Sequence, residues 1–172
     1  MLTTTAVKAH LRVEHDEDDT LIDNLTTAAY SYAERYTNTI ILDTQKIDYL
    51  DDFADEITLK NTPVQSITTV TYYDTDDVQQ SQSDYYLDTR KAETILKPLN
   101  NEVFPSTNGD YANVVITYQA GYSTIPKQID QAVLLLIGSL YEQRENHVAG
   151  ITMTKSVVSA EYLLDPYRVD TL

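Results

Sequence analysis

The spacing of apolar residues changes twice along the chain, and this change constrains the fold more than any other feature. Residues 1 to about 40 carry apolar side chains at intervals of three and four, as an amphipathic helix does. From about residue 44 to residue 122 the interval becomes two, and β-forming residues dominate. Beyond that point the helical spacing returns. The sequence therefore predicts an α+β fold in which a β-rich segment interrupts a helical framework.

We expect the 172 residues to form a single domain, because a chain of this length can bury a sizeable core. Its helical core would come from residues 1–42 and 123–172, with two long packed helices and short terminal helices. The β-rich insert would span residues 43–122. Because its strands are mostly consecutive and joined by short turns, we expect them to form an antiparallel meander.

The N-terminal region predicts a short helix around Thr4 to Leu11 and a long helix after the acidic run Asp16–Asp19. Apolar residues from Leu21 to Tyr36 form one stripe along this long helix. The acids lie where the helix dipole favours negative charge, and Asn38 is an acceptable left-handed stop. Near the other end of the chain, a short helix is expected at 160–164.

The stretch "AGYSTIPKQIDQAVLLLIGSLYEQREN", residues 120–146, predicts a second long helix with more apolar surface than one buried face requires. A stripe from Ile129 to Leu140 would pack on the first long helix. A second patch consists of Leu134, Leu135, Gly138 and Tyr141. Either the sheet or the C-terminal helix covers this patch within the monomer, or the patch is a subunit interface. The pattern leaves both interpretations open.

The composition argues against several classes of function. Cysteine is absent, the three histidines are not spaced as a metal-binding pair, and four glycines are too few for a phosphate-binding loop. A net charge of −15 opposes binding to nucleic acid. The sequence has no secretory signal and no apolar run of about 20 residues, so we expect a soluble intracellular product. We predict no catalysis, no cofactor and no bound metal.

The acidic run Asp16–Asp19 supports one alternative, a metal-dependent nuclease or other hydrolase. Four contiguous acids at the start of a helix point in different directions, however, and the helix dipole is sufficient to explain them. A generic intracellular interaction domain is a third interpretation.

Four segments of the chain together suggest a family. In order they are "VKAHLRVEHDEDDTLIDNLTTAAYSYAERYTN", "PVQSITTVTYYD", "VVITYQAGYSTIPKQIDQAVLLLIGSLYEQREN" and "EYLLDPYRV". This order resembles the head–tail connector (adaptor) proteins of long-tailed bacteriophages. The resemblance covers nearly the whole chain, and its most specific parts are "AGYSTIPKQIDQAVLLLIGSLYEQRE" and "LLDPYR". The acidic β segment between residues 43 and 113 is longer here than in compact members.

The resemblance implies a structural virion protein without enzymatic activity. Such proteins form a ring, typically of twelve subunits, beneath the portal protein of a DNA-filled capsid. The ring extends the DNA channel and provides a docking surface for the next head-completion or tail protein. Double-stranded DNA would pass through without specific binding, and no membrane is involved. The protein would be assembled in the host cytoplasm and located in the neck of the virion.

The resemblance also implies roles for three sets of residues. The patch of Leu134, Leu135, Gly138 and Tyr141 would pack on a neighbouring subunit through a heterologous contact that closes into a ring. The C-terminal segment would contact the portal, unless it folds back on its own core; its residues are Leu163, Leu164, Pro166, Tyr167 and Arg168. Acidic turns are candidates for a channel or outer rim to which DNA does not adhere; these are Asp51, Asp52, Asp74, Asp76 and Asp77.

Overall fold

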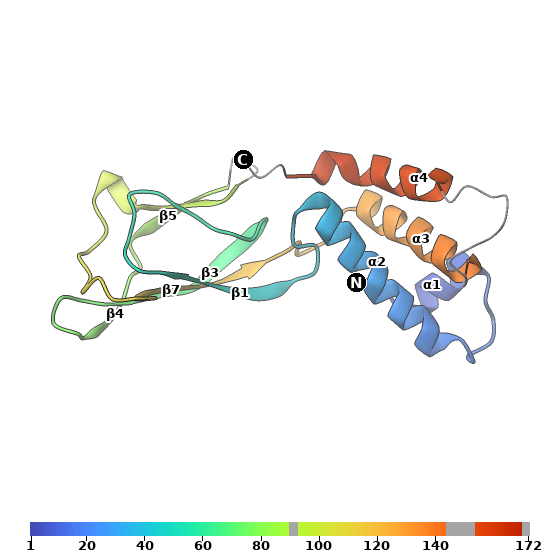
Figure 1. The fold of residues 1–172 in the computed structure, drawn as a ribbon, viewed down its shortest axis with the longest axis horizontal. Coiled ribbons are helices and arrows are strands. Elements are labelled where there is room, and N and C mark those ends of the chain that lie inside the picture. The colour runs from blue at the N-terminus through green and yellow to red at the C-terminus, as the bar shows by residue number, and fades with distance from the viewer. Residues whose placement is uncertain (90–92, 144–153, 170–172) are drawn as a thin grey trace. The chain divides into compact units, whose positions relative to one another are not determined.

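The computed structural model describes residues 1–89, 93–143 and 154–169, which form an α+β fold (Figure 1). The helices are α1 (Thr4–Leu11), α2 (Asp19–Thr37), α3 (Lys127–Glu142) and α4 (Thr154–Leu164), with short 3-10 helices at Leu99–Asn101 and Asp165–Tyr167. The strands are β1 (Thr44–Leu50), β2 (Ile57–Thr58), β3 (Val64–Tyr73), β4 (Gln79–Ser81), β5 (Tyr85–Asp88), β6 (Ile95–Pro98) and β7 (Val114–Ala120). None of the helices within the described ranges combines the length and apolarity needed to cross a bilayer.

The chain divides into two compact units. The helical unit contains Met1–Leu42 and Thr124–Leu172, and the β unit contains Asp43–Ser123. These units correspond to the helical core and the insert that the change of apolar spacing predicts. Whether they unfold together, as the expected single domain requires, stays a prediction.

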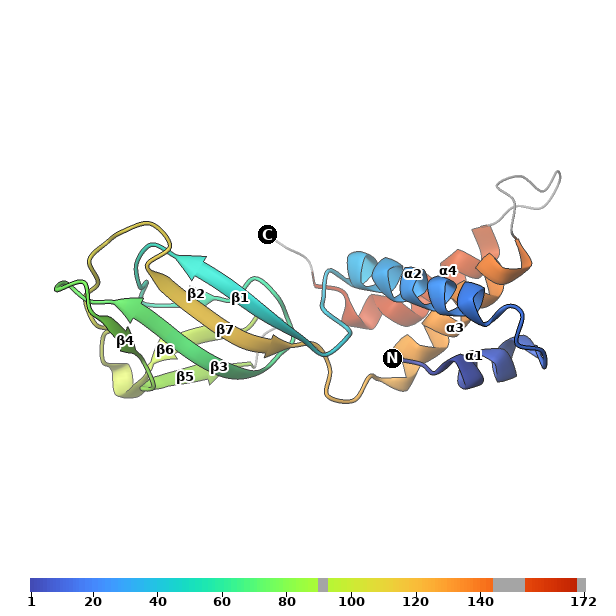
Figure 2. The ribbon, with the colours of Figure 1, turned by 90° about the horizontal axis from the view of Figure 1, so that it is seen from below.

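In the helical unit, α3 packs against each of the other three helices (Figures 1 and 2). Its inward stripe is almost completely buried: Ile129, Ala132, Val133, Leu136 and Ile137 are at most 5% exposed. The opposing helices contribute buried side chains that include Val7 of α1, Ile22 of α2 and Leu164 of α4. Three neighbours thus account for part of the additional apolar surface of α3.

The helix boundaries follow local sequence signals. The side chain of Thr3 accepts a hydrogen bond from the backbone N–H of Ala6 and caps α1. Asn38 ends α2 in the left-handed conformation, at φ 53°, as expected. Pro126 directly precedes the first residue of α3, where its missing N–H costs no hydrogen bond. The last part of the helix expected over 120–146, residues 144–146, lies outside the described residues.

Two expectations for the helical unit are wrong. Helix α4 begins at Thr154 and not at Ala160, so it is longer at its N-terminal end than the short helix expected at 160–164. Leu140, expected at the end of the inward stripe of α3, is 39% exposed. Its position near the end of α3 carries it past the helices that cover the rest of the stripe.

The β unit contains two antiparallel sheets with the strand orders β1-β7-β3-β4 and β2-β6-β5. All pairings are antiparallel as predicted, but the order is not that of a simple meander, because β7 lies between β1 and β3. Strand β1 opens the insert and β7 closes it, so their pairing from Thr44↔Ala120 to Leu50↔Val114 brings the two ends of the insert together. The short, wholly polar β4 pairs with β3 at the edge of this sheet.

The two sheets lie one over the other and enclose an apolar core (Figures 1 and 2). The larger sheet contributes Val70, Tyr72, Val114 and Ile116, each at most 9% exposed. The smaller sheet contributes residues that include Leu96, which is fully buried. Alternation along β7 is strict: its inward residues are buried and those between them are partly exposed.

Candidate assembly surfaces

The second apolar patch of α3 is partly occupied by contacts within the monomer. A Cβ atom placed on Gly138 would lie 3.8 Å from Nε2 of His10 and 4.0 Å from Cδ2 of Leu11, so this edge of α3 faces α1. The hydroxyl of Tyr141 donates a hydrogen bond of 2.5 Å to Oδ2 of Asp18, the residue that precedes α2. The other two members of the patch, Leu134 and Leu135, are half-buried.

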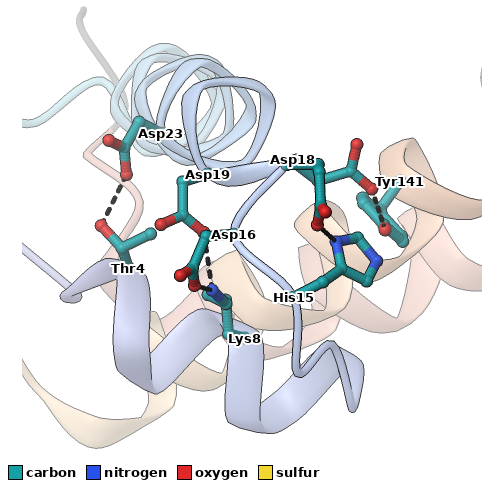
Figure 3. Close-up of polar contacts among 9 residues, drawn as sticks. Thr4, Lys8, His15, Asp16, Asp18, Asp19, Asp23 and Tyr141 are labelled. Atoms are coloured by element: carbon teal, nitrogen blue, oxygen red, sulfur yellow. Dashed lines mark hydrogen bonds and ion pairs between the residues drawn. The ribbon is translucent and has the colours of Figure 1, made fainter.

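The acidic run Asp16–Asp19 is a set of separate contacts rather than one cluster (Figure 3). Its first and fourth members lie 2.5 and 2.8 Å from the ammonium of Lys8 in α1. Its second member lies 2.9 Å from Nδ1 of His15, and its third accepts the hydrogen bond from Tyr141 in α3. Asp16 and Asp19 therefore converge on one ammonium, while Glu17 and Asp18 point to other partners, so the expectation that all four carboxylates point in different directions holds only in part.

These contacts link α1, the α1–α2 loop, α2 and α3. The hydrogen bond from Lys8 holds the pKa of Asp16 below its ordinary value, and hydrogen bonds to Asp16 and Asp19 raise the pKa of Lys8. A further hydrogen bond of 2.7 Å joins the hydroxyl of Thr4 to Asp23 across α1 and α2. Among the described residues, no group of three or more His, Asp and Glu side chains is arranged to hold a metal ion.

The C-terminal segment folds back on the helical unit. Leu164 is fully buried, and the hydroxyl of Tyr167 donates a hydrogen bond of 2.7 Å to Oε1 of Gln128 in α3. The guanidinium of Arg168 lies over the ring of Tyr36 in α2, 5.9 Å from its centroid. Leu163 is half-buried, whereas Pro166 and Arg168 are exposed.

Two tyrosines of α2 strengthen this attachment. Tyr32 donates a hydrogen bond of 2.7 Å to Glu161, and Tyr36 donates one of 2.5 Å to Asp165. Burial, with the hydrogen bond to Glu161, raises the pKa of Tyr32 to about 12. The hydrogen bond to Asp165 raises the pKa of Tyr36. In both pairs the neutral phenol is the donor, so the contacts depend on the tyrosines remaining protonated.

The acidic turns of the β unit order its loops. Asp51 accepts a hydrogen bond of 2.9 Å from the backbone N–H of Ala112, and Asp52 accepts one of 2.9 Å from the hydroxyl of Thr107. Asp77 accepts one of 2.5 Å from the side-chain amide of Asn108. Three carboxylates from two turns therefore bind the same long loop before β7, while all three side chains remain exposed.

The turn between β3 and β4 is organised by Asp74. One of its carboxylate oxygens accepts hydrogen bonds of 3.0 Å from the backbone N–H groups of Asp76 and Val78, and the other accepts one of 2.7 Å from Gln80. The hydrogen bond from Gln80, followed by that from Val78, lowers the pKa of Asp74. The side chain of Asp76 is exposed at the tip of the turn.

Sequence reasoning missed a polar cluster in the core of the β unit. The buried hydroxyl of Tyr118 donates a hydrogen bond of 3.1 Å to Oδ2 of Asp48 and accepts hydrogen bonds from the side-chain amide and backbone N–H of Asn61, at 2.9 and 3.2 Å. The same Asp48 oxygen accepts a hydrogen bond of 3.0 Å from the backbone of Lys60. Burial raises the pKa of Tyr118. The signal in the sequence was an aspartate at an inward position of β1, where an apolar residue belongs.

An open depression of about 770 Å³ lies beside β5 and β6. Its walls carry apolar residues, one lysine and three carboxylates; they are Asp55, Glu56, Tyr86, Lys97, Pro98, Leu99, Asn100, Glu102 and Val103. Lys97 is paired with Glu56. Among the described residues of its walls there is no histidine, serine or cysteine that could form a nucleophile–base pair.

Comparison with protein families gives one match that covers nearly the whole chain. A family model described as "Head completion protein" matches residues 1–161. Among curated proteins, no significant match was found.

Solved structures share the fold along almost the entire chain. A chain in the virion of a native gene transfer agent particle has 22% identity and a TM-score of 0.77, covering 99% of this chain and 91% of that chain. A chain in the neck of the empty particle, computed with C6 symmetry, has the same identity and coverage and a TM-score of 0.75. A chain in the neck of the native particle, computed with C12 symmetry, has 23% identity and a TM-score of 0.68, covering 100% and 93%. At this level of identity the likeness establishes a common fold.

Proposed function

The chain belongs to the head completion protein family, and we propose that it acts as a head–tail connector in the neck of a phage-like particle. The observation that carries this proposal is the family match over residues 1–161, and the shared fold with chains from virion and neck structures supports it. The role is structural: the protein extends the channel for DNA beneath the portal and docks the next neck or tail protein.

In this role the protein forms a ring, with twelve copies as the proposed number. The similar chains come from necks described with C6 and C12 symmetry, which is consistent with that number. We propose that Leu134 and Leu135, half-buried on α3, contact the next copy together with the exposed Leu140. Beside this surface, Gly138 faces α1 and Tyr141 holds the α1–α2 loop through its hydrogen bond to Asp18. The contact is heterologous, so that repetition closes the ring.

The portal contact is proposed for the C-terminal segment in its folded-back position. Pro166 and Arg168 are exposed and can reach a partner, with Leu163 beside them. Leu164 anchors the segment by its burial in the helical unit, and Tyr167 anchors it by the hydrogen bond to Gln128 in α3. Arg168 offers the planar donor group suited to a carboxylate on the portal.

The protein guides DNA without retaining or cutting it. The exposed carboxylates of the β unit, among them Asp51, Asp52, Asp76 and Asp77, repel a phosphate backbone and fit a channel or rim. Asp74 shapes the turn that carries two of them. The acidic run Asp16–Asp19 is engaged in contacts within the helical unit, which supports the proposal that the protein has no nuclease activity.

Electron microscopy of the purified protein mixed with its cognate portal tests the proposal. We expect a ring of this protein coaxial with the portal. A portal that stays bare at saturating protein concentration contradicts the connector role. Incubation of the protein with DNA and Mg²⁺ or Mn²⁺ provides a second test, in which cleavage that depends on Asp16 would contradict the structural role.

A further inference from the structure

The outer face of the larger sheet is a surface that the proposed function does not use. Because Asp48, Ile116 and Val70 point toward the smaller sheet, the residues between them along each strand point outward. The register aligns these outward residues in two central rows, Ile47–Thr117–Thr69 and Tyr49–Val115–Thr71. We call these six residues the sheet face. Figure 2 views the sheet from this side.

The sheet face has no charged residue, although the chain contains 27 acidic and 12 basic residues. The other outward positions of β1, β7, β3 and β4 hold only glutamine, serine and tyrosine. An ordinary protein surface carries a charge on about one residue in three or four. The carboxylate of Asp43 marks one end of the surface, where it accepts hydrogen bonds from Gln65 and Gln119. The acidic turns lie beyond the strands.

The sheet face also exposes large apolar side chains. Ile47 is 46% exposed and Tyr49 is 55% exposed, and they follow one another along the outward side of β1. The threonines of β3 and β7 beside them are β-branched residues, which pack well on a pleated surface. The free energy falls when another protein surface packs on these apolar side chains and removes them from water.

The charge of the chain determines which partner this surface fits. Each copy carries a net charge of −15, so two copies repel one another wherever their carboxylates meet. A basic partner would instead bind at the carboxylates elsewhere on the surface, and not at this uncharged face. We infer that the sheet face packs against a neighbouring copy of this chain, as one of the two different surfaces that a heterologous ring contact requires. This inference rests on the proposed ring.

The absence of cysteine from the chain allows a direct test. Thr69→Cys places a thiol at the exposed centre of the sheet face, and Asp76→Cys places one at the exposed tip of an acidic turn as a control. Both variants are labelled with a maleimide, first as free protein and then in rings assembled on the portal. We expect labelling of Thr69→Cys to slow by about tenfold or more in the ring, because the core of an interface excludes solvent, whereas Asp76→Cys keeps its rate.

A charge substitution gives an independent readout. Thr69→Glu places a carboxylate on the sheet face, and Ser106→Glu adds the same charge to an exposed loop of the same unit. We expect Thr69→Glu to remain folded by circular dichroism but to form no ring, while Ser106→Glu assembles like the wild type. Two results overturn this inference alone. One is labelling of Thr69→Cys that is as fast in the ring as in the free protein, and the other is ring formation by Thr69→Glu. A wild-type protein that forms no ring overturns the proposed function and the inference with it.

Discussion

The buried hydroxyl of Tyr118 provides the sharpest test of how the β unit is stabilised. Tyr118→Phe removes one oxygen and leaves the ring, so the apolar packing of this fully buried side chain is preserved and no cavity forms. What disappears is the donor to Asp48 and the acceptor for two N–H groups of Asn61. Asp48 is 5% exposed. Of its two described hydrogen bonds in the cluster, it loses the one from Tyr118 and keeps the one from the backbone of Lys60.

The expected loss follows from the kind of hydrogen bond that is removed. A hydrogen bond to a charged group contributes about 1.5–3 kcal/mol to stability, and a neutral one about 1 kcal/mol. Asn61 is half-exposed, so water replaces part of what its N–H groups lose. Asp48 is buried and cannot recover its partner from solvent in this way. We therefore expect Tyr118→Phe to lower the free energy of unfolding by about 2 kcal/mol.

Urea denaturation, followed by circular dichroism and by tyrosine fluorescence, measures this loss. Tyr111→Phe is the matched control, because the Tyr111 side chain is 91% exposed and its hydroxyl stays in water; we expect a change within about 0.5 kcal/mol. If Tyr118→Phe changes stability no more than this control does, the cluster is not a stabilising network. Coincident transitions from the two signals also test the expectation that both units unfold as a single domain.

Three further predictions concern the helical unit. Gly138→Ala is expected to stabilise the monomer by up to about 1 kcal/mol, since its new Cβ would come no closer than 3.8 Å to His10 and alanine favours a helix; a lower thermal midpoint would contradict this. Lys8→Met is expected to lower the thermal midpoint most at low salt, because the ion pairs with Asp16 and Asp19 are lost, and added salt should narrow the difference between the two proteins; a difference that does not change with salt would refute the assignment. The pKa of Tyr32 is raised to about 12 from an unfolded value of about 10, so the folded state holds its proton more tightly. Its contribution is complete below pH 10 and is lost as pH rises toward 12, and Tyr32→Phe should flatten the decline of thermal stability over this interval.

Periodicity predicted the parts of the fold that depend on local sequence. The first helix was placed at Thr4–Leu11, and the left-handed end of α2 at Asn38, because capping and apolar spacing act within a few residues. The strands after Asp43 were found for the same reason. The family resemblance was confirmed by the match over residues 1–161, since the order of helical and β segments extends along the whole chain.

The pairing of distant strands could not be read in this way. The strand pattern of β1 is equally compatible with a hairpin to β2, and the pairing with β7 depends on both ends of the insert joining the helical unit. The start of α4 was missed because its first residues, from Thr154 to Ser159, include threonine, serine and valine, which have weak intrinsic helix propensity. Packing against α3 outweighs that propensity.

The second face of α3 shows what an apolar pattern can and cannot determine. The pattern identifies positions that avoid water, but it gives no information about which surface covers them. The sequence left open whether the monomer or a neighbouring subunit covers the patch that contains Gly138, and the structure places α1 beside this residue at ordinary contact distance. The effect of Gly138→Ala on ring assembly therefore separates the two interpretations: an alanine that stabilises the monomer and leaves assembly intact places this part of the face inside the protomer. The subunit contact would then depend on Leu134, Leu135 and the sheet face, and the charge distribution over the surface would be a better guide to assembly than the apolar residues of a single helix.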